Sequence, residues 1–405
     1  MVISNAVVCD SSGERKADVR IEEGVLKEIG EGLKCSEMID AKGAYFMPLL
    51  LDLNVRLQDC VLNANNIKAL SNQALKGGVG HIVLNPDSNP AIDNEVALEF
   101  AQNSLGTLKG AKIDLMLGTL KEDATLSNIA ILLKRGAVAP YMSTIAKNNL
   151  AIKIAEYVKM YDVTLFCKAE DNSLINSGVM LEGDVSSSLG LAGIPDLSEV
   201  LHVSRMIEIA RHFKIKILFK SIASPRSIYL ISQAKKDGVE VTCEVSIHHL
   251  IHADKACENF NTTAKINPPL ASLSDVQLLQ AALKGAEIDI LTSLHQPSSP
   301  VHKEVAFYDA EYGCEAIEDA LCLYYTKLVK SKMLTMSDVV KLTATNPAKS
   351  IGAQYGTFKI GEKINALLFD IHEETVIENS QSLYNGEVLS GKVTMTFQES
   401  KVSKF

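Results

Sequence analysis

The chain has 405 residues, of which 47% are hydrophobic and 22% are charged. These proportions are ordinary for a globular protein and supply enough apolar surface for a large core, which argues against extensive disorder. The formal net charge of -9, without any run of Lys or Arg, argues against nucleic acid or an anionic membrane surface as the main partner. Small molecules and proteins remain as the expected partners.

Cysteine usage and the N-terminal segment predict a cytoplasmic protein. The eight cysteines are scattered without a CxxC pair, and residues 1–20 lack a basic segment followed by an apolar one. The most apolar early stretch, residues 45–53, is interrupted by Pro48 and Asp52 and is far shorter than a membrane span. We therefore expect reduced thiols and no transmembrane segment.

The two ends of the chain share a strand-and-turn pattern. Residues 1–48 read as short strands separated by turns, without helical periodicity. Residues 350–405 have the same character, with turn signals at Gly361, Asn385-Gly386 and Gly391. We expect both ends to build one small β-sandwich domain.

Residues 49–349 alternate short apolar runs with amphipathic helical patterns such as those of residues 148–161 and 197–213. This alternation predicts an α/β domain in the form of a (β/α)8 barrel. An open doubly wound sheet is the main competitor, but its Gly-rich phosphate loop is missing, and Gly77 to Gly80 read as a helix cap before the second strand. The eight runs expected to form strands are residues 49–57, 79–85, 112–118, 135–142, 163–168, 215–221, 239–245 and 288–293.

In such barrels the reacting groups lie at the C-terminal ends of the strands. A hydrolytic zinc site needs several His, Asp or Cys side chains at these ends. Only Asp87 among the strand-end residues would ligate a metal well. The positions are Asn54, Arg56, Asn85, Asp87, Met142, Lys168, Ser221, Ser293 and Leu294.

The histidines offer one alternative metal site. His81, His202, His212 and His372 fall in helix patterns, at a strand start or in the terminal segments, where a structural role is the default. A second set follows the seventh and eighth strands at the functional end of the barrel, and the HHLIH segment in it lacks the Glu of a zinc protease motif. The alternative ligands for zinc are His248, His249 and His295.

Nucleophilic catalysis has little support in the sequence. No G-x-S-x-G motif is present, and Cys167 and Cys243 lie inside predicted strands, where a buried and inert thiol is expected.

Several segments resemble dihydroorotases, which are cyclic amidohydrolases of the amidohydrolase superfamily. The first barrel strand of that family runs Pro-Gly-hydrophobic-Asp-x-His-x-His-hydrophobic-Arg, and residues 47–57 of this chain read MPLLLDLNVRL. The resemblance covers nearly the whole chain. Further matches are, in chain order, LNPDSNPAIDN, KAEDNSLI, MLEGDVSSSLGLAGIPDLSEVLHVSRMIEIA, VEVTCEVSIHHL, AKINPPL and TATNPAKSIG.

The departures from this family fall on its metal ligands. Asn54 and Arg56 stand at the two histidines of the first strand, and the bridging aspartate or carboxylated lysine has no counterpart in residues 139–143. The later ligand positions are also changed. Lys168 and Ser221 replace histidines after the fifth and sixth strands, and Ser293 replaces the catalytic aspartate of the eighth, where a one-residue shift would align His295 with a family histidine.

Substrate contacts are only partly kept. Asn267 in INPPL survives, Gln58 stands where the family has an arginine, and Asp87 replaces an asparagine. We therefore regard Asn267, Gln58 and Asp87 as the remaining candidates for substrate binding.

The cations at the strand ends suggest a replacement for metal charge. Arg56 and Lys168 would fill that space, because a buried cation left unpaired costs several kcal/mol and needs an acidic neighbour. Asp52, Asp87, Glu170 or Asp171 should then lie close to them. The alternative is that both side chains extend to solvent at the barrel mouth.

The resemblance and its departures together favour a non-catalytic dihydroorotase-like protein of pyrimidine biosynthesis without a cofactor. Catalytically empty chains of this family act as scaffolding partners of aspartate carbamoyltransferase, so that enzyme is the expected partner, and a homodimer is the competing assembly. Two other hypotheses remain open. One is an active cyclic amidohydrolase with an unusual zinc site, and the other is a protein that binds a carboxylate metabolite through Arg56 and Lys168 without turnover.

Overall fold

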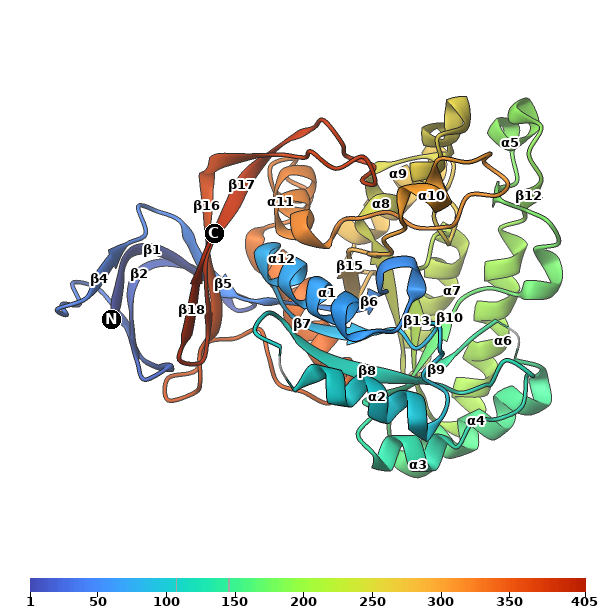
Figure 1. Ribbon diagram of the computed structural model, residues 1–405, viewed down its shortest axis with the longest axis horizontal. Coiled ribbons are helices and arrows are strands. Elements are labelled where there is room, and N and C mark those ends of the chain that lie inside the picture. The colour runs from blue at the N-terminus through green and yellow to red at the C-terminus, as the bar shows by residue number, and fades with distance from the viewer. Residues whose placement is uncertain (107, 145) are drawn as a thin grey trace.

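The structure is a computed structural model that describes residues 1–106, 108–144 and 146–405. It contains two large sheets, a parallel one wrapped into a barrel and a second one built from both ends of the chain (Figure 1). In the described ranges, none of the helices combines the length and hydrophobicity needed to cross a membrane.

The barrel sheet has eight strands in the order β15-β14-β13-β10-β9-β8-β7-β6, and all neighbouring pairs are parallel. Seven of the eight predicted runs contain one of these strands, and β14 extends one residue beyond the seventh run, residues 239–245, so the predicted (β/α)8 barrel is confirmed. Buried on both sides, the strands are almost continuously apolar. They are β6 (Leu50–Val55), β7 (Val79–Leu84), β8 (Lys112–Gly118), β9 (Ala139–Met142), β10 (Thr164–Lys168), β13 (Lys216–Lys220), β14 (Val241–Ser246) and β15 (Ile290–Thr292).

Amphipathic helices surround the barrel and bury their apolar faces against it (Figure 1). The two helical patterns named from the sequence form α4 and α6, as predicted. The longer helices are α1 (Ala64–Lys76), α2 (Glu95–Leu105), α4 (Asn148–Tyr161), α6 (Leu197–Phe213), α7 (Pro225–Lys236) and α9 (Leu273–Lys284). The shorter ones are α3 (Ile129–Lys134), α5 (Asp184–Leu189), α8 (Ile247–Ile251), α10 (Pro300–Lys303), α11 (Ala320–Tyr324), α12 (Met336–Val340) and α13 (Asn346–Ser350).

The predicted helix cap before the second strand is also confirmed. Gly77 is the C-cap of α1, and Gly78 has a φ of +84°, a left-handed conformation that favours glycine. A Cβ on Gly77 would lie 1.9 Å from the carbonyl oxygen of Ile317. This close approach lets α1 turn directly into β7.

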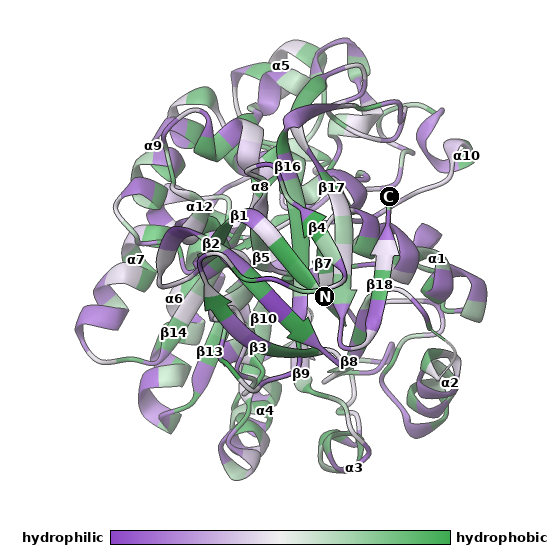
Figure 2. Ribbon diagram, turned by 90° about the vertical axis from the view of Figure 1, so that its left-hand side faces the viewer, coloured by the Kyte–Doolittle hydropathy of each residue, from purple (hydrophilic) through white to green (hydrophobic). Residues whose placement is uncertain are grey.

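The terminal segments share the second sheet, in the order β18-β17-β16-β5-β1-β2-β3, with β4 paired to β1. Its strands pack around a core of their own that includes Phe46 and Phe397. Apolar and polar residues alternate along residues 17–22 of β2 (Figure 2). The strands are β1 (Val2–Asp10), β2 (Gly13–Glu22), β3 (Val25–Gly30), β4 (Met38–Asp40), β5 (Tyr45–Pro48), β16 (Asn365–Val376), β17 (Val388–Gln398) and β18 (Lys401–Lys404).

The connection between β16 and β17 extends from the terminal sheet to the barrel (Figure 1). Tyr384 on this connection is buried, and its hydroxyl lies 3.1 Å from Nδ1 of His248 on α8. The backbone NH of Glu315 donates to the carbonyl of Gln381 at 3.0 Å. The C-terminal segment is thereby fastened to the face of the barrel where the strands end. A small parallel pair, β11 (Met180–Leu181) and β12 (Gly193–Ile194), frames the loop that carries α5.

Candidate functional site

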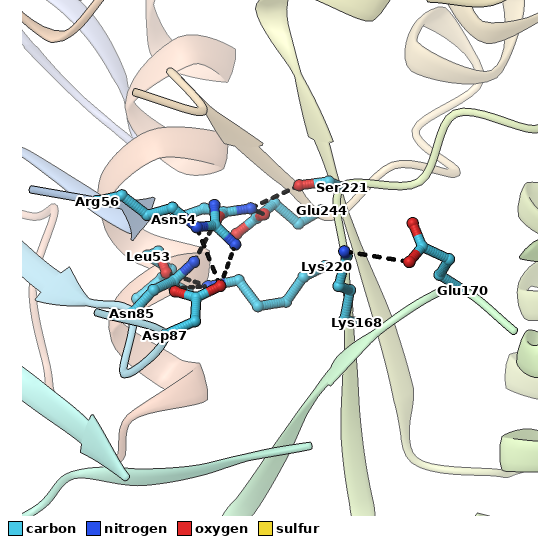
Figure 3. A network of polar contacts seen from close by, with 10 residues as sticks. All are labelled: Leu53, Asn54, Arg56, Asn85, Asp87, Lys168, Glu170, Lys220, Ser221 and Glu244. Carbon is cyan, nitrogen blue, oxygen red and sulfur yellow. Dashed lines mark hydrogen bonds and ion pairs between the residues drawn. The ribbon is translucent and has the colours of Figure 1, made fainter. Parts of the chain in front are cut away.

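The ends of β6, β7, β13 and β14 are joined by hydrogen bonds through Asn54 (Figure 3). Nδ2 of Asn54 donates to Oγ of Ser221 at 2.5 Å and to Oε1 of Glu244 at 2.6 Å. Its Oδ1 accepts from Nδ2 of Asn85 at 2.9 Å. With only 2% of its surface exposed, Asn54 is a buried structural amide rather than a free ligand.

Arg56 forms an ion pair with Asp87 at the mouth of the barrel. Its Nη2 and Nε donate to Oδ2 of Asp87 at 2.7 and 3.0 Å. The side chain of Arg56 is 12% exposed and that of Asp87 is 37% exposed. Lys168 is paired in the same way, since its Nζ lies 3.2 Å from Oε1 of Glu170. The expectation that both cations have acidic neighbours is thus confirmed for Asp87 and Glu170.

The other two acids named from the sequence have different partners. Oδ1 of Asp52 accepts from Oγ1 of Thr292 at 2.5 Å, and its Oδ2 accepts from the backbone NH of Ser293 at 2.8 Å. Asp52 therefore links the first barrel strand to the last. Asp171 accepts from the backbone NH of Ser173 at 3.0 Å and caps a short 3-10 helix.

Lys220 is the cation that lies deepest in the site, and it was not identified from the sequence. It is only 2% exposed, and its Nζ donates to the carbonyl of Leu53 at 2.5 Å and to Oδ1 of Asn85 at 2.7 Å. Burial lowers its pKa to about 8, although Glu244 acts in the opposite direction. The ammonium is therefore the predominant form at neutral pH.

A chain of hydrogen bonds runs from this ammonium to the carboxylate of Glu244. Lys220 donates to Asn85, Asn85 donates to Asn54, and Asn54 donates to Glu244. Every donor in the chain points from the cation toward the anion, so the bonds polarise one another. Glu244 is fully buried, and burial raises its pKa, an effect that Lys220 opposes.

The predicted replacement at the sixth strand needs refinement. Ser221 does reach the cluster, but it follows β13 and only accepts from Asn54. The preceding residue, Lys220, brings the charge. The segment KILFKS carried a signal for it, namely a lysine at the end of an apolar strand, and Glu244 within the apolar run of β14 was a similar signal.

Neither Ser293 nor residues 139–143 supply the aspartate or carboxylated lysine that the family has at these positions. Ser293 is fully buried, and its Oγ has no hydrogen-bond partner among the described residues. Tyr141 from β9 lines the cavity beside Lys220, and burial raises the pKa of its hydroxyl far above the ordinary value. It stays protonated at neutral pH.

Zinc, which the family resemblance implies, does not fit these side chains. Zinc requires thiolates, imidazoles or carboxylates. The carboxylates at the strand ends are engaged with other groups, Asp52 with Thr292 and Ser293, Asp87 with Arg56, and Glu170 with Lys168. The remaining side chains are amides, hydroxyls and the cations Arg56, Lys168 and Lys220. The buried ammonium would also repel a divalent ion. Across residues 1–106, 108–144 and 146–405, no group of three or more His, Cys, Asp or Glu side chains is arranged to hold a metal ion.

The alternative histidine ligands are engaged elsewhere. His248 contacts Tyr384 through Nδ1 and Cys314 through Nε2, each at 3.1 Å. His249 contacts Oγ of Ser246 at 2.7 Å and the carbonyl of Pro268 at 3.0 Å. For His295, Nδ1 accepts from two backbone NH groups, and Nε2 has no hydrogen-bond partner in the described part of the chain. The structure therefore does not bring these three rings together as a ligand set.

The cysteines inside the barrel strands are buried, as expected. Cys167 and Cys243 are fully buried. Cys167 lies 3.1 Å from Nε2 of His202, and burial raises its pKa to about 12. Cys314, beside His248, has its pKa raised to about 12 for the same reason. At neutral pH, Cys167 and Cys314 would therefore not form the thiolate that nucleophilic catalysis requires.

The three candidates for substrate binding have different surroundings, and within the described residues only Asn267 has an unpaired polar atom in the cavity. Asn267 lines a small cavity together with Arg56, Lys168 and Lys220, and its buried Oδ1 has no hydrogen-bond partner in the described ranges. Asp87 is committed to Arg56, and Gln58 opens a 3-10 helix, η1 (Gln58–Cys60), just beyond β6. The volume of this cavity is only about 10 Å³, room for about one water molecule and far below the range of ligand pockets.

Comparisons with known proteins support the resemblance over the whole chain. No protein-family model matches it. A dihydroorotase from Elusimicrobium minutum is 34% identical over 413 residues, which cover 98% of this chain and 95% of the relative. A dihydroorotase from Caldanaerobacter subterraneus is 31% identical over 422 residues, which cover 99% of this chain and 96% of the relative. The chain belongs to the dihydroorotase family.

Solved structures support the fold of this dihydroorotase-family chain. The L-hydantoinase (dihydropyrimidinase) from Arthrobacter aurescens has a TM-score of 0.88 and 21% identity, with 99% of this chain and 95% of that chain covered. A D-hydantoinase (dihydropyrimidinase) from Thermus sp. has a TM-score of 0.84 and 19% identity, with 100% and 95% covered. At this identity the match concerns the barrel and its terminal sheet alone.

Proposed function

We propose that this member of the dihydroorotase family is not a catalyst and serves as a structural or regulatory partner of aspartate carbamoyltransferase in pyrimidine biosynthesis. The observation that carries the non-catalytic part is the buried Lys220 ammonium, which is hydrogen-bonded through Asn85 and Asn54 to Glu244. Opening a cyclic amide requires an activated water and a polarised carbonyl. In this network the ammonium and the two amides are instead engaged in hydrogen bonds within the protein.

The charges at the mouth of the barrel support the same proposal. Arg56 is committed to Asp87 and Lys168 to Glu170, so neither cation is held ready for a substrate carboxylate. This pairing also counts against the metabolite-binding hypothesis. That hypothesis predicts a higher melting temperature in the presence of dihydroorotate or carbamoyl aspartate, because a ligand that binds only the folded state stabilises it.

The partner is proposed from the resemblance, since non-catalytic chains of this family are scaffolds for aspartate carbamoyltransferase. The similarity here extends over 95–96% of the length of the dihydroorotase relatives. The strand-end residues, by contrast, differ from the motifs of the family that the chain resembles. Such a pattern suits a protein that is retained for its outer surface. A stable complex of this kind should bury more than about 1,000 Å² per contact.

Co-expression with the aspartate carbamoyltransferase of the same organism tests the partnership. We expect the two chains to elute together from size-exclusion chromatography, earlier than either chain alone. If the carbamoyltransferase elutes unchanged and keeps its activity with and without this chain, the proposed partnership is wrong. A homodimer without the carbamoyltransferase is the competing result, and it would contradict the proposal in the same way.

A further inference from the structure

The Lys220 ammonium contacts groups from several other barrel strands at once. It donates to the carbonyl of Leu53 on β6 and to Asn85 directly after β7. It also lies 5.7 Å from the ring centroid of Tyr141 on β9 and 5.6 Å from that of Phe166 on β10. These are cation-π distances, so the aromatic faces contribute to holding the charge. One cation thereby ties the ends of neighbouring strands together.

Of the two acids near this ammonium, Glu244 is the one whose carboxyl group is not fully hydrogen-bonded. Glu244 is fully buried and Asp52 is 3% exposed. Oε2 of Glu244 has no hydrogen-bond partner among the residues described, so only one of its oxygens is neutralised by hydrogen bonding. A buried carboxylate without a counter-charge is strongly destabilising. The charge of Lys220 opposes the effect of burial on the pKa of Glu244. Its Nζ donates to Asn85, whose amide donates to Asn54, which in turn donates to Glu244 (Figure 3).

We propose that Lys220 is a built-in cation of the barrel. Its ammonium supplies the positive charge that Glu244 requires and occupies a cation site made of the Leu53 carbonyl, the Asn85 amide and two aromatic rings. If the lysine side chain is removed, this site should accept a small organic ammonium ion. The inference rests on the proposed function only in requiring that no divalent ion lies here.

Two substitutions test the pairing with Glu244. Lys220→Met keeps the length of the side chain but removes its charge, and we expect a melting temperature several degrees below that of the wild type. Adding Glu244→Gln should recover part of this loss, because the uncompensated carboxylate is then gone. Lys168→Met is the matched control, since Lys168 is 27% exposed, and it should have a much smaller effect.

A wild-type melting temperature for Lys220→Met would overturn the proposal, as would a double variant that loses as much as the two single changes together. If neither Lys220→Met nor the double variant with Glu244→Gln folds, the proposal is also overturned, because the second substitution then recovers none of the lost stability.

Chemical rescue tests the cation site itself. In Lys220→Ala, ethylammonium chloride should raise the melting temperature in a saturable manner, because it binds the folded state alone. Sodium chloride at equal ionic strength should not do so, and Lys168→Ala should not respond to ethylammonium. If ethylammonium does not raise the melting temperature of Lys220→Ala, or if the controls show an equal rise, the proposed cation site is wrong. If Lys220→Ala is recovered only as aggregate, the comparison of Lys220→Met with its Glu244→Gln double variant decides.

The two proposals fail in distinguishable ways. Stoichiometric zinc bound at the strand ends of the wild type would remove both. A metal-free and inactive wild type whose Lys220 variants show no coupling and no rescue would remove only the built-in cation.

Discussion

Replacing Asp87 by asparagine tests whether the cations at the barrel mouth depend on their internal partners. The Asp87→Asn substitution would keep the shape of the side chain and one acceptor oxygen but would leave the guanidinium of Arg56, which is 12% exposed, without its counter-charge. Breaking a fully buried ion pair costs about 3–5 kcal/mol and breaking an exposed one about 0–1 kcal/mol. Because Asp87 is itself 37% exposed, we expect a loss between these limits, about 1–2 kcal/mol.

The assay is unfolding in urea followed by circular dichroism, because urea, unlike guanidinium, does not screen charges. Asp162→Asn is the matched control. Asp162 pairs with Lys216 at 2.9 Å, with side-chain exposures of 86% and 43%, so its loss should stay below about 0.5 kcal/mol. Equal losses in the two variants would refute the reasoning and would mean that Arg56 is free to bind a ligand.

Three further predictions concern metal, restored ligands and the barrel mouth. Purified protein should contain no stoichiometric zinc by elemental analysis, and EDTA should leave its melting temperature unchanged; near-unit occupancy would contradict this. Restoring Asn54→His and Arg56→His together should yield neither zinc binding nor dihydroorotase activity, because the Lys220 ammonium remains, and recovery by this pair would show that the later strands are misassigned. Tyr384→Phe should destabilise the protein by about 1–3 kcal/mol in urea unfolding, because it leaves Nδ1 of the buried His248 without its partner; an unchanged midpoint would show that this contact is dispensable.

The barrel could be predicted because each of its strands is a local signal. Runs such as residues 112–118 are apolar, are bounded by turns and alternate with amphipathic helices, and the structure places β8 at Lys112–Gly118. The location of the first two metal-ligand positions of the family could be predicted for a related reason. Asn54 and Arg56 lie at fixed offsets in a family motif at the end of one strand, so their place at the mouth follows from the barrel alone.

The features of the site that could not be predicted from the sequence depend on contacts between distant segments. Lys220 and Ser221 are adjacent at a strand end, and the sequence does not say which side chain enters the cluster. The Asn54 contact with Glu244 joins residues 190 positions apart, and the contact of His248 with Tyr384 spans 136 positions. No local pattern reports such pairs. The sequence therefore leaves His248 open as a metal ligand, whereas the structure engages it with Tyr384 of the β16–β17 connection.

The most direct test of the central claim is a dihydroorotase assay in both directions on the purified wild-type chain with added zinc. The chain should be produced in a host that lacks its own dihydroorotase. We predict no rate above the buffer blank, because the strand ends offer nothing that fits zinc or activates a water. A rate that scales with protein concentration and falls in an Arg56→Ala variant would contradict the account and would identify the chain as an active cyclic amidohydrolase.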